Sequence, residues 1–340
     1  MTYTLSMTSR NVAALLLVVA LVGTASVAVS ACTSFALFGE RTLYGMNFDY
    51  PPNEIRFSIE DHEAGAVFIG SFWMGDHYGR TVGMNEHGLF SSDQMVSPLR
   101  AAVDELGDDE MYIWNAFYDG LRTCTSVVEV LDLIGDRRLV QYPSLALHNL
   151  FADTSGDAMV VEAGTPENAI TRIDGPFLVM TNFNNSDFSG TPLDAIFGDG
   201  ADRYRAAYRM LENHVEPLDI DQAFDILEST SQPAGSCKTR YSLVASPEAL
   251  TIYIALERDY DHIWMISLRE RTIETYRGFY TQHTLQLDEI GVTGPTLLVL
   301  AEQPLKSMLG QIRSPNWIWL ALLTGALVVA CVLFAAMSKI

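Results

Sequence analysis

The sequence is poor in cysteine and in positive charge, and both shortages exclude classes of function. It has four cysteines in 340 residues, and no two of them stand at the close spacing of a zinc ribbon. Lysine and arginine together number 21 against 42 acidic residues, which gives a formal net charge of −21. Such a surface repels nucleic-acid phosphates, so we expect no nucleic-acid partner.

Patterns of metal ligands are also missing. The seven histidines are scattered along the chain, and His62-Glu63 lacks the second histidine of a zinc protease motif. A polar loop carries several carboxylates that could bind calcium, although a solvated loop is the simpler interpretation. These carboxylates belong to Asp187, Asp194, Asp199 and Asp202. The sequence therefore shows no clear pattern of metal ligands.

Charge is nearly absent from the first 31 residues. Arg10 is the one charged side chain there, and an uncharged run follows from Asn11 to Ala31. A basic start, an apolar middle and small residues at Val29 and Ala31 are typical of a secretory signal. We predict a signal peptide over residues 1–31, and an uncleaved membrane anchor is the alternative.

A second uncharged run extends from Trp317 to Met337. At about 1.5 Å rise per residue, a helix of this length spans roughly 30 Å, the thickness of a bilayer core. Tryptophans at its start are typical of a membrane interface. We predict a transmembrane helix over residues 317–337, preceded by a linker over 286–316. The protein would cross the cell membrane once and hold its folded domain outside the cytoplasm.

Between these runs, residues 32–285 show no strong break in composition and are predicted to form one domain. The domain begins with strand-like segments at 33–38 and 42–48, which a short turn joins in a hairpin. Further strands are expected at 55–59, 66–73, 89–92, 169–173 and 177–180, within 145–162, and within 240–277, with a tight turn at 83–89. Helices are expected at 110–122 and 201–214, at 127–134 after the cap residue Ser126, and after the cap residue Asp219. This mixture predicts an α+β fold with mostly antiparallel sheets.

Cys32 directly follows the predicted cleavage point, and this position suggests a chemical role. Cleavage before Cys32 places a thiol, with a usual pKa of about 8.5, and an α-amine, of about 7.7–8.0, on one residue. Near neutral pH part of the amine is uncharged and can accept the thiol proton, so one residue holds a nucleophile and its base. The predicted hairpin returns Asp49 to the side of Cys32.

Five short motifs occur in an order that is typical of one family. They are Cys-Thr-Ser at 32–34, Gly-Met-Asn-Phe-Asp at 45–49, Gly-Met-Asn-Glu-His-Gly-Leu at 83–89, Thr-Asn at 181–182 and Asp-Arg-Tyr at 202–204. In these motifs the chain resembles the N-terminal-nucleophile hydrolases of the linear-amide branch. This branch includes choloylglycine (bile salt) hydrolases, penicillin V acylases, and acid ceramidase-like and isopenicillin N acyltransferase-like enzymes.

The resemblance implies a four-layer αββα sandwich and hydrolysis of a linear, non-peptide C–N amide bond without a cofactor. It implies that Cys32 is the nucleophile and that Asp49 holds its amine or thiol in place. It also implies that Asn182 lies near the oxyanion and that Arg203 stabilises the charged site. These roles agree with the chemistry of the residue types, because an amide donates to an oxyanion and a guanidinium fixes negative charge.

Two positions depart from the pattern of the choloylglycine hydrolases. Met46 stands where those enzymes usually have arginine, and the further oxyanion residue falls at Gln94 or Met95. Gln94 can donate an amide hydrogen bond, whereas the side chain of Met95 cannot. We expect Met46, Gln94 and Met95 to contact the substrate, with a specificity different from strict bile-salt hydrolysis.

The sequence therefore predicts a cysteine amidase that cleaves a small-molecule N-acyl amide through a thioester. An acyltransferase is the alternative if an amine replaces water. Val29-Ser30-Ala31-Cys32 is also similar to a lipoprotein processing site, in which Cys32 would carry lipid and no catalysis would follow. A thiol protease that uses Cys124 or Cys237 with a histidine is a third interpretation, and outside the cell these two cysteines could instead form a disulfide. A homo-oligomer also stays open.

Overall fold

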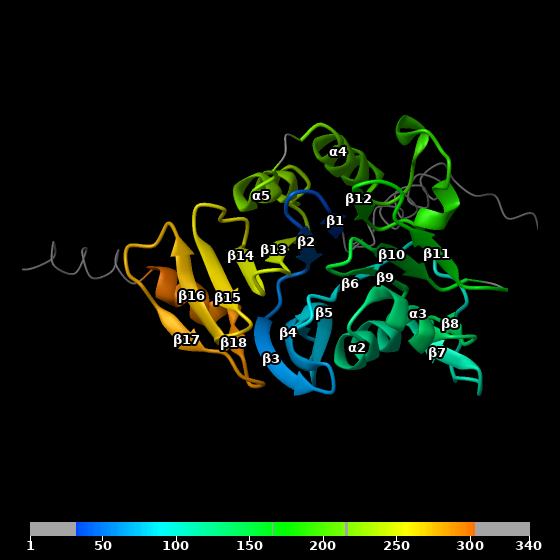
Figure 1. Cartoon of the computed structure of the whole chain (residues 1–340), viewed down its shortest axis with the longest axis horizontal. Coiled ribbons are helices and arrows are strands. Elements are labelled where there is room, and N and C mark those ends of the chain that lie inside the picture. The colour runs from blue at the N-terminus through cyan, green and yellow to red at the C-terminus, as the bar shows by residue number, and fades with distance from the viewer. Residues whose placement is uncertain (1–31, 165, 215–216, 303–340) are drawn as a thin grey trace, which may run out of the picture.

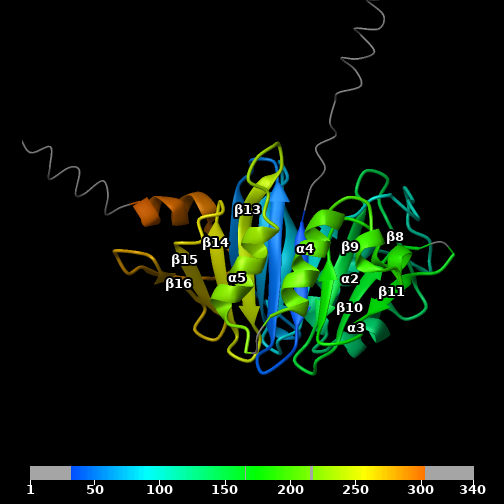
Figure 2. The ribbon, with the colours of Figure 1, turned by 90° about the horizontal axis from the view of Figure 1, so that it is seen from above.

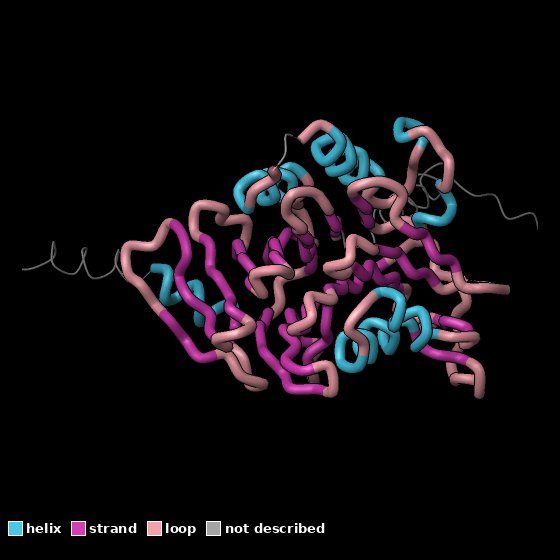
Figure 3. The backbone as a smooth tube through the Cα atoms, viewed as in Figure 1, coloured by secondary structure: helices cyan, strands magenta, loops and turns pink. Residues whose placement is uncertain are grey.

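The computed structural model describes residues 32–302, except residue 165 and residues 215–216. Two eight-stranded sheets face each other, and helices cover the outer face of each, so the layers follow the order αββα (Figure 1). Strands fill the middle of the molecule and helices its two outer sides (Figure 3). The predicted signal peptide and transmembrane helix lie outside the described residues.

Neighbouring strands in the first sheet are all antiparallel. In spatial order the sheet contains β12 (Phe177–Met180), β1 (Thr33–Leu37), β2 (Leu43–Tyr50), β13 (Lys238–Ser246), β14 (Thr251–Leu256), β15 (Ile263–Ser267), β16 (Thr272–Arg277) and β17 (Thr284–Gln286). The predicted hairpin is confirmed as β1 and β2, with Thr33 opposite Asn47. Strand β1 therefore lies between β12 and β2, at an interior position of the sheet.

The second sheet is also antiparallel throughout. Its spatial order is β11 (Ala169–Arg172), β10 (Ala158–Glu162), β9 (Leu147–Ala152), β6 (Phe90–Met95), β5 (Tyr78–Asn85), β4 (Gly65–Trp73), β3 (Ile55–His62) and β18 (Val292–Thr293). A small parallel pair, β7 (Glu110–Tyr112) and β8 (Arg138–Val140), stands apart from both sheets. The expectation of mostly antiparallel sheets is confirmed.

Two pairs of helices form the outer layers. Helices α4 (Ala201–Glu212) and α5 (Ile220–Ser229) pack on the first sheet and lie in front of its strands in Figure 2. Helices α2 (Ile113–Thr123) and α3 (Val127–Ile134) pack on the second sheet. Two short 3₁₀ helices, η1 (Asn185–Phe188) and η2 (Leu193–Ala195), occupy the loop before α4.

Helix starts follow the predicted caps. The Ser126 hydroxyl accepts from the backbone N–H of Glu129 at the start of α3, and Asp219 forms a reciprocal capping box with Gln222 at the start of α5. Each such cap stabilises a helix by about 1 kcal/mol because it satisfies a backbone N–H that has no partner within the helix.

The period of two along each strand divides the interior into layers. In β2, Tyr44, Met46 and Phe48 enter the core between the sheets, whereas Leu43 packs beneath α4 and α5. A third apolar cluster lies between the second sheet and the helices α2 and α3. Both faces of the central strands are therefore buried, and β1 and β9 are buried at every position although they include polar residues such as Ser34 and Asn149, so simple alternation is hidden in the sequence.

Strand β5 and the start of α2 differ from the prediction. The segment 83–89 was expected to be a turn, but β5 continues to Asn85 and the turn begins at Glu86. The helix expected from Glu110 begins at Ile113, because residues 110–112 pair with β8 instead. Strand β5 pairs with its neighbours along the chain, β4 and β6, whereas β7 pairs with β8, which follows α2 and α3.

The fold continues past residue 285, so the predicted linker over 286–316 is partly folded. Strand β18 pairs with β3, and a helical segment follows over residues 294–302. Leu287 and Leu297 are buried in the core between the sheets. In the described part of the chain, no helix has the length and apolar character needed to span a bilayer.

We predict that Leu297→Ala lowers the free energy of unfolding by about 2–5 kcal/mol, because the change leaves a cavity in the core between the sheets. The control is Val299→Ala, since Val299 lies on the same segment and is largely exposed. Urea denaturation measures both changes. Equal stability of the two variants would show that residues 294–302 do not belong to the folded unit.

Candidate active site

Cys32 stands directly before β1, at the point where the chain enters the first sheet. Its side chain is 2% exposed and contributes to the wall of a cavity of about 520 Å³. Its backbone nitrogen donates a hydrogen bond to Asn182 Oδ1 at 2.9 Å. In the full-length chain this nitrogen belongs to the peptide bond with Ala31, and cleavage of that bond would turn it into an α-amine. The predicted nucleophile therefore lies at a cavity and has a fixed nitrogen.

Asn182 and Arg203 connect three distant segments at Cys32. Arg203, in the first turn of α4, donates from Nη2 to Asn182 Oδ1 at 2.7 Å. Its Nη1 donates to the carbonyl of Cys32 and to Thr33 Oγ1, the latter at 3.0 Å. All three acceptors are buried with the guanidinium. The predicted grouping of Cys32, Asn182 and Arg203 is present in the structure.

A glycine makes room for this guanidinium. Gly200 caps α4 with φ of 75°, a left-handed conformation that favours glycine. A Cβ at this position would lie 2.5 Å from Arg203 Nη2. Gly200 therefore allows both the turn into α4 and the approach of the arginine.

Asn182 uses its amide differently from the prediction. Its oxygen, not its nitrogen, faces the backbone nitrogen of Cys32. Its Nδ2 donates to the Met95 carbonyl at 2.7 Å, which leaves one of the two Nδ2 hydrogens for another acceptor. Asn182 is therefore placed to orient the nitrogen of Cys32 as well as to donate a hydrogen bond.

Asp49 lies at the end of β2, beside Cys32. Its backbone carbonyl is 4.0 Å from Cys32 Sγ, and its carboxylate accepts from the Thr239 hydroxyl at 2.5 Å. Burial raises the pKa of Asp49 to about 7, although the Thr239 hydrogen bond and the charges of Arg203 and Arg258 act in the opposite direction. Asp49 therefore changes its charge close to neutral pH, unlike an ordinary aspartate.

The three residues that were expected to contact the substrate lie in different environments. They are Met46, Gln94 and Met95. Met46 is fully buried in the core between the sheets and is not among the residues that line the cavity, so the predicted contact with substrate is not supported. Gln94 and Met95 do line the cavity. The Gln94 amide, however, lies 2.5 Å from Ser34 Oγ and so holds β1. Met95 takes part through its backbone carbonyl, which a side-chain motif does not reveal.

The cavity is mainly apolar and aromatic. Its lining residues include Phe48, Phe72, Trp114, Phe117, Leu145 and Leu147. Asp93 also lines the cavity, and burial raises its pKa well above the usual value, although a hydrogen bond from Asn149 opposes this effect. Arg80 adds a cation to the wall and stacks on Tyr118.

The remaining cysteines do not support a disulfide or a thiol protease. Cys124 and Cys237 are both free. Cys124 follows α2, in the layer outside the second sheet, whereas Cys237 precedes β13 in the first sheet. Burial raises the pKa of both thiols, which disfavours the reactive thiolate. Within residues 32–302, apart from the undescribed positions, no group of three or more His, Cys, Asp or Glu residues could hold a metal.

Solved structures share the fold at low sequence identity. Conjugated bile acid hydrolase from Clostridium perfringens is 19% identical with a TM-score of 0.58, over 72% of this chain and 96% of that chain. A variant of the same hydrolase is 19% identical with a TM-score of 0.57, over 76% of this chain and all of that chain (100%). Penicillin V acylase from Agrobacterium tumefaciens is 18% identical with a TM-score of 0.53, over 72% and 90%.

These similarities confirm the expected fold, a sandwich of mostly antiparallel sheets with helices on its outer faces. No curated protein sequence matches the chain. A family model described as acyl-coenzyme A:6-aminopenicillanic acid acyl-transferase matches residues 38–270, which begin just after Cys32. Because this match covers more than half of the sequence, the chain belongs to that family.

Proposed function

We propose that the protein is an amidase with an N-terminal cysteine, which hydrolyses the linear amide bond of a small N-acyl substrate. The observation that carries this proposal is the position of Cys32. Its thiol lines an apolar cavity of about 520 Å³, while its nitrogen is held by Asn182. Cys32 therefore holds both a nucleophile and the nitrogen that would serve as its base, and it borders a space for an acyl group.

The proposed reaction starts with cleavage of the bond between Ala31 and Cys32. The free α-amine accepts the thiol proton, and Cys32 Sγ attacks the amide carbonyl carbon. The resulting oxyanion collapses, the C–N bond breaks, and the leaving amine takes the proton from the α-amine. A thioester remains, and water attacks it with the α-amine again acting as base. The carboxylic acid leaves and the thiol is restored.

Charge stabilisation would come from the network around Asn182. One Nδ2 hydrogen of Asn182 binds the Met95 carbonyl, and we assign the other to the oxyanion. Arg203 holds the Asn182 side chain and adds a buried positive charge close to Cys32. Fixed donors in a site with little water stabilise a developing charge more strongly than mobile solvent does.

The cavity indicates which part of the substrate the protein selects. Its walls are mostly apolar, so the acyl group would occupy the cavity and the amine would leave toward solvent. The names of the similar structures, a bile acid hydrolase and a penicillin V acylase, support cleavage of an amide. Acyl transfer to an amine is the second candidate, because the matching family is named for an acyltransferase. Adding amines and measuring new amides distinguishes the two.

We also propose that the folded domain lies outside the cytoplasm and that the apolar run 317–337 anchors it in the membrane. The uncharged run 11–31 would direct export and end at the cleavage point before Cys32. A substrate with an apolar tail is available to such a site at a membrane surface.

The first prediction concerns the nucleophile. The mature protein should begin at Cys32, as measured by mass spectrometry of its N-terminal peptide. Cys32→Ala should abolish hydrolysis of a panel of acyl amides that includes penicillin V and N-acyl homoserine lactones, whereas Cys124→Ala should keep it. Full activity of Cys32→Ala, or a lipid on Cys32 in the mature protein, would refute the amidase.

A second prediction tests the cavity. Leu145→Trp adds bulk to the wall, so kcat/KM for the longest acyl chain should fall by about tenfold or more, with little change for acetyl or butyryl amides. Val128→Trp, at an exposed position of α3, is the control. A uniform decrease for all chain lengths would contradict an acyl group in this cavity.

A third prediction concerns Asp49 in the uncleaved chain. Between about pH 4 and pH 7 the folded chain keeps a proton that an unfolded aspartate releases, so this carboxyl lowers the free energy of unfolding as the pH rises through that window. Asp49→Asn removes this titration and should stabilise the chain by roughly 2–4 kcal/mol more at pH 8 than at pH 4.

Chemical denaturation at the two pH values measures this difference. The control is Asp225→Asn, which removes an exposed carboxylate on α5 and leaves the buried Asp49 in place. The uncleaved chain is needed, since a charged α-amine beside Asp49 would itself lower the pKa of this group. A stabilisation that is equal at both pH values would show that Asp49 titrates like an exposed aspartate.

A further inference from the structure

A row of buried polar side chains crosses the inner face of the second sheet. His148 on β9 pairs directly with Gln94 on β6 and with Glu162 on β10. All three side chains are buried, and Leu150 and Val160 on the same face belong to the core between the sheets. Polar groups at such positions destabilise a fold unless they are hydrogen-bonded, so their partners indicate why they are there.

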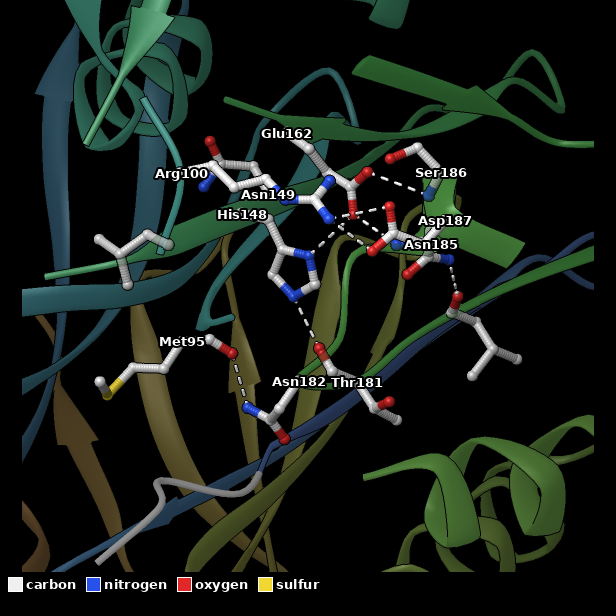
Figure 4. Close-up of polar contacts among 12 residues, drawn as sticks. Met95, Arg100, His148, Asn149, Glu162, Thr181, Asn182, Asn185, Ser186 and Asp187 are labelled. Atoms are coloured by element: carbon white, nitrogen blue, oxygen red, sulfur yellow. Dashed lines mark hydrogen bonds and ion pairs between the residues drawn. The ribbon is translucent and has the colours of Figure 1, made fainter. Parts of the chain in front are cut away.

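The partners of this row lie on the loop that carries Asn182 (Figure 4). His148 Nε2 lies 2.6 Å from the carbonyl oxygen of Thr181, and Nδ1 lies 3.5 Å from Glu162 Oε1. Glu162 in turn accepts from the backbone N–H groups of Asn185 at 2.5 Å and Ser186 at 3.1 Å. His148 and Glu162 therefore hold the loop on both sides of Asn182.

Gln94 completes the row. With its amide oxygen facing Ser34, its nitrogen donates to the same Thr181 carbonyl at 3.3 Å. The Asn182 carbonyl accepts from the backbone N–H of Ser97 at 2.9 Å. These hydrogen bonds fix the carbonyls of Thr181 and Asn182. Because the backbone of Asn182 is held in this way, the direction of its side chain is set as well.

We propose that His148, held by Glu162, is a positioning residue for the reaction at Cys32. It fixes the Thr181 carbonyl so that the Asn182 side chain meets the nitrogen of Cys32 and the guanidinium of Arg203. The proposal rests on the amidase function proposed above. His148 itself is buried behind Asn182 and is not among the residues that line the cavity, so it acts through Asn182 and not on the substrate.

The hydrogen-bond partners define the proton positions in the pair. The Thr181 carbonyl can only accept, so Nε2 carries a hydrogen. Burial raises the pKa of Glu162, but the hydrogen bond and charge of His148 and the hydrogen bonds from Ser186 outweigh this effect and lower it. Nδ1 thus faces an ionised carboxylate. On the same loop, Asn182 accepts from Arg203, and Asp187 of η1 forms an ion pair with Arg100.

The test separates kcat from KM. His148→Leu removes the contact with Thr181, so kcat for an acyl amide should fall about tenfold to a hundredfold through misplacement of Asn182, while KM changes by less than about twofold. His148→Gln, whose amide can still donate to Thr181, should recover most of kcat. The control is His262→Gln, because His262 forms an exposed pair with Asp259 and should leave kcat unchanged.

Glu162→Gln keeps the shape of the side chain and removes its charge. If the carboxylate holds His148 in place, kcat should fall as it does in His148→Leu, while KM changes by less than about twofold. A purely structural role would reduce the melting temperature of these variants but leave kcat per folded molecule as in the wild type. That result would overturn the proposal.

A measurement that needs no substrate distinguishes a failure of this proposal from a failure of the proposed amidase function. The rate at which iodoacetamide alkylates Cys32 in the mature protein reports the thiol and its nitrogen. Slower alkylation in His148→Leu and an unchanged rate in His262→Gln would support the positioning role, even if wild-type protein cleaves no amide in a Cys32-dependent way. Equal rates in both variants would refute it, whatever the amidase assay shows.

Discussion

The buried guanidinium of Arg203 is the interaction on which the site depends. A positive charge that is only 6% exposed is unfavourable unless its hydrogens have acceptors. The Cys32 carbonyl, the Thr33 hydroxyl and the Asn182 amide supply these acceptors. Two of them lie at the start of β1 and the third lies in the loop after β12, so the charge joins segments that are far apart in the sequence. Removing it would take a donor from each of these oxygens, and Asn182 Oδ1 would keep only the backbone N–H of Cys32 among the contacts described above.

Local features of the fold were predictable because their causes are local. A short turn between apolar segments predicted the β1–β2 hairpin, and caps at Ser126 and Asp219 predicted two helices. The order of strands in the sheets has no such local cause. Strand β2 pairs with β13, where Asn47 lies opposite Ser242. No residue close to either strand in the sequence predicts that pairing. For the same reason the start of α2 differed from the prediction, because residues 110–112 pair with β8, which follows α3.

At the site, the motifs identified the residues that meet but not the atoms that touch. Asn182 was expected near Cys32, and it is there, yet its oxygen faces the cysteine nitrogen. Met95 takes part through a carbonyl, which every residue has. Met46 could have been placed correctly, since the period of two along β2 puts it on the same face as Tyr44 and Phe48, in the core. His148 and Glu162 belong to no motif, and only the pairing of β9 with β10 brings them together.

The contacts around Cys32 are already complete while its nitrogen is still part of a peptide bond. Under the proposed mechanism, cleavage therefore adds a titratable amine to a site whose geometry is fixed, and it requires no rearrangement of Asn182 or Arg203. The new amine would lie between two opposing influences. Arg203 disfavours a second positive charge, whereas Asp49 favours one once it has lost its proton near pH 7. Because the amine must be uncharged to accept the thiol proton, the balance between this guanidinium and this carboxyl determines how much of the protein is ready to react at a given pH.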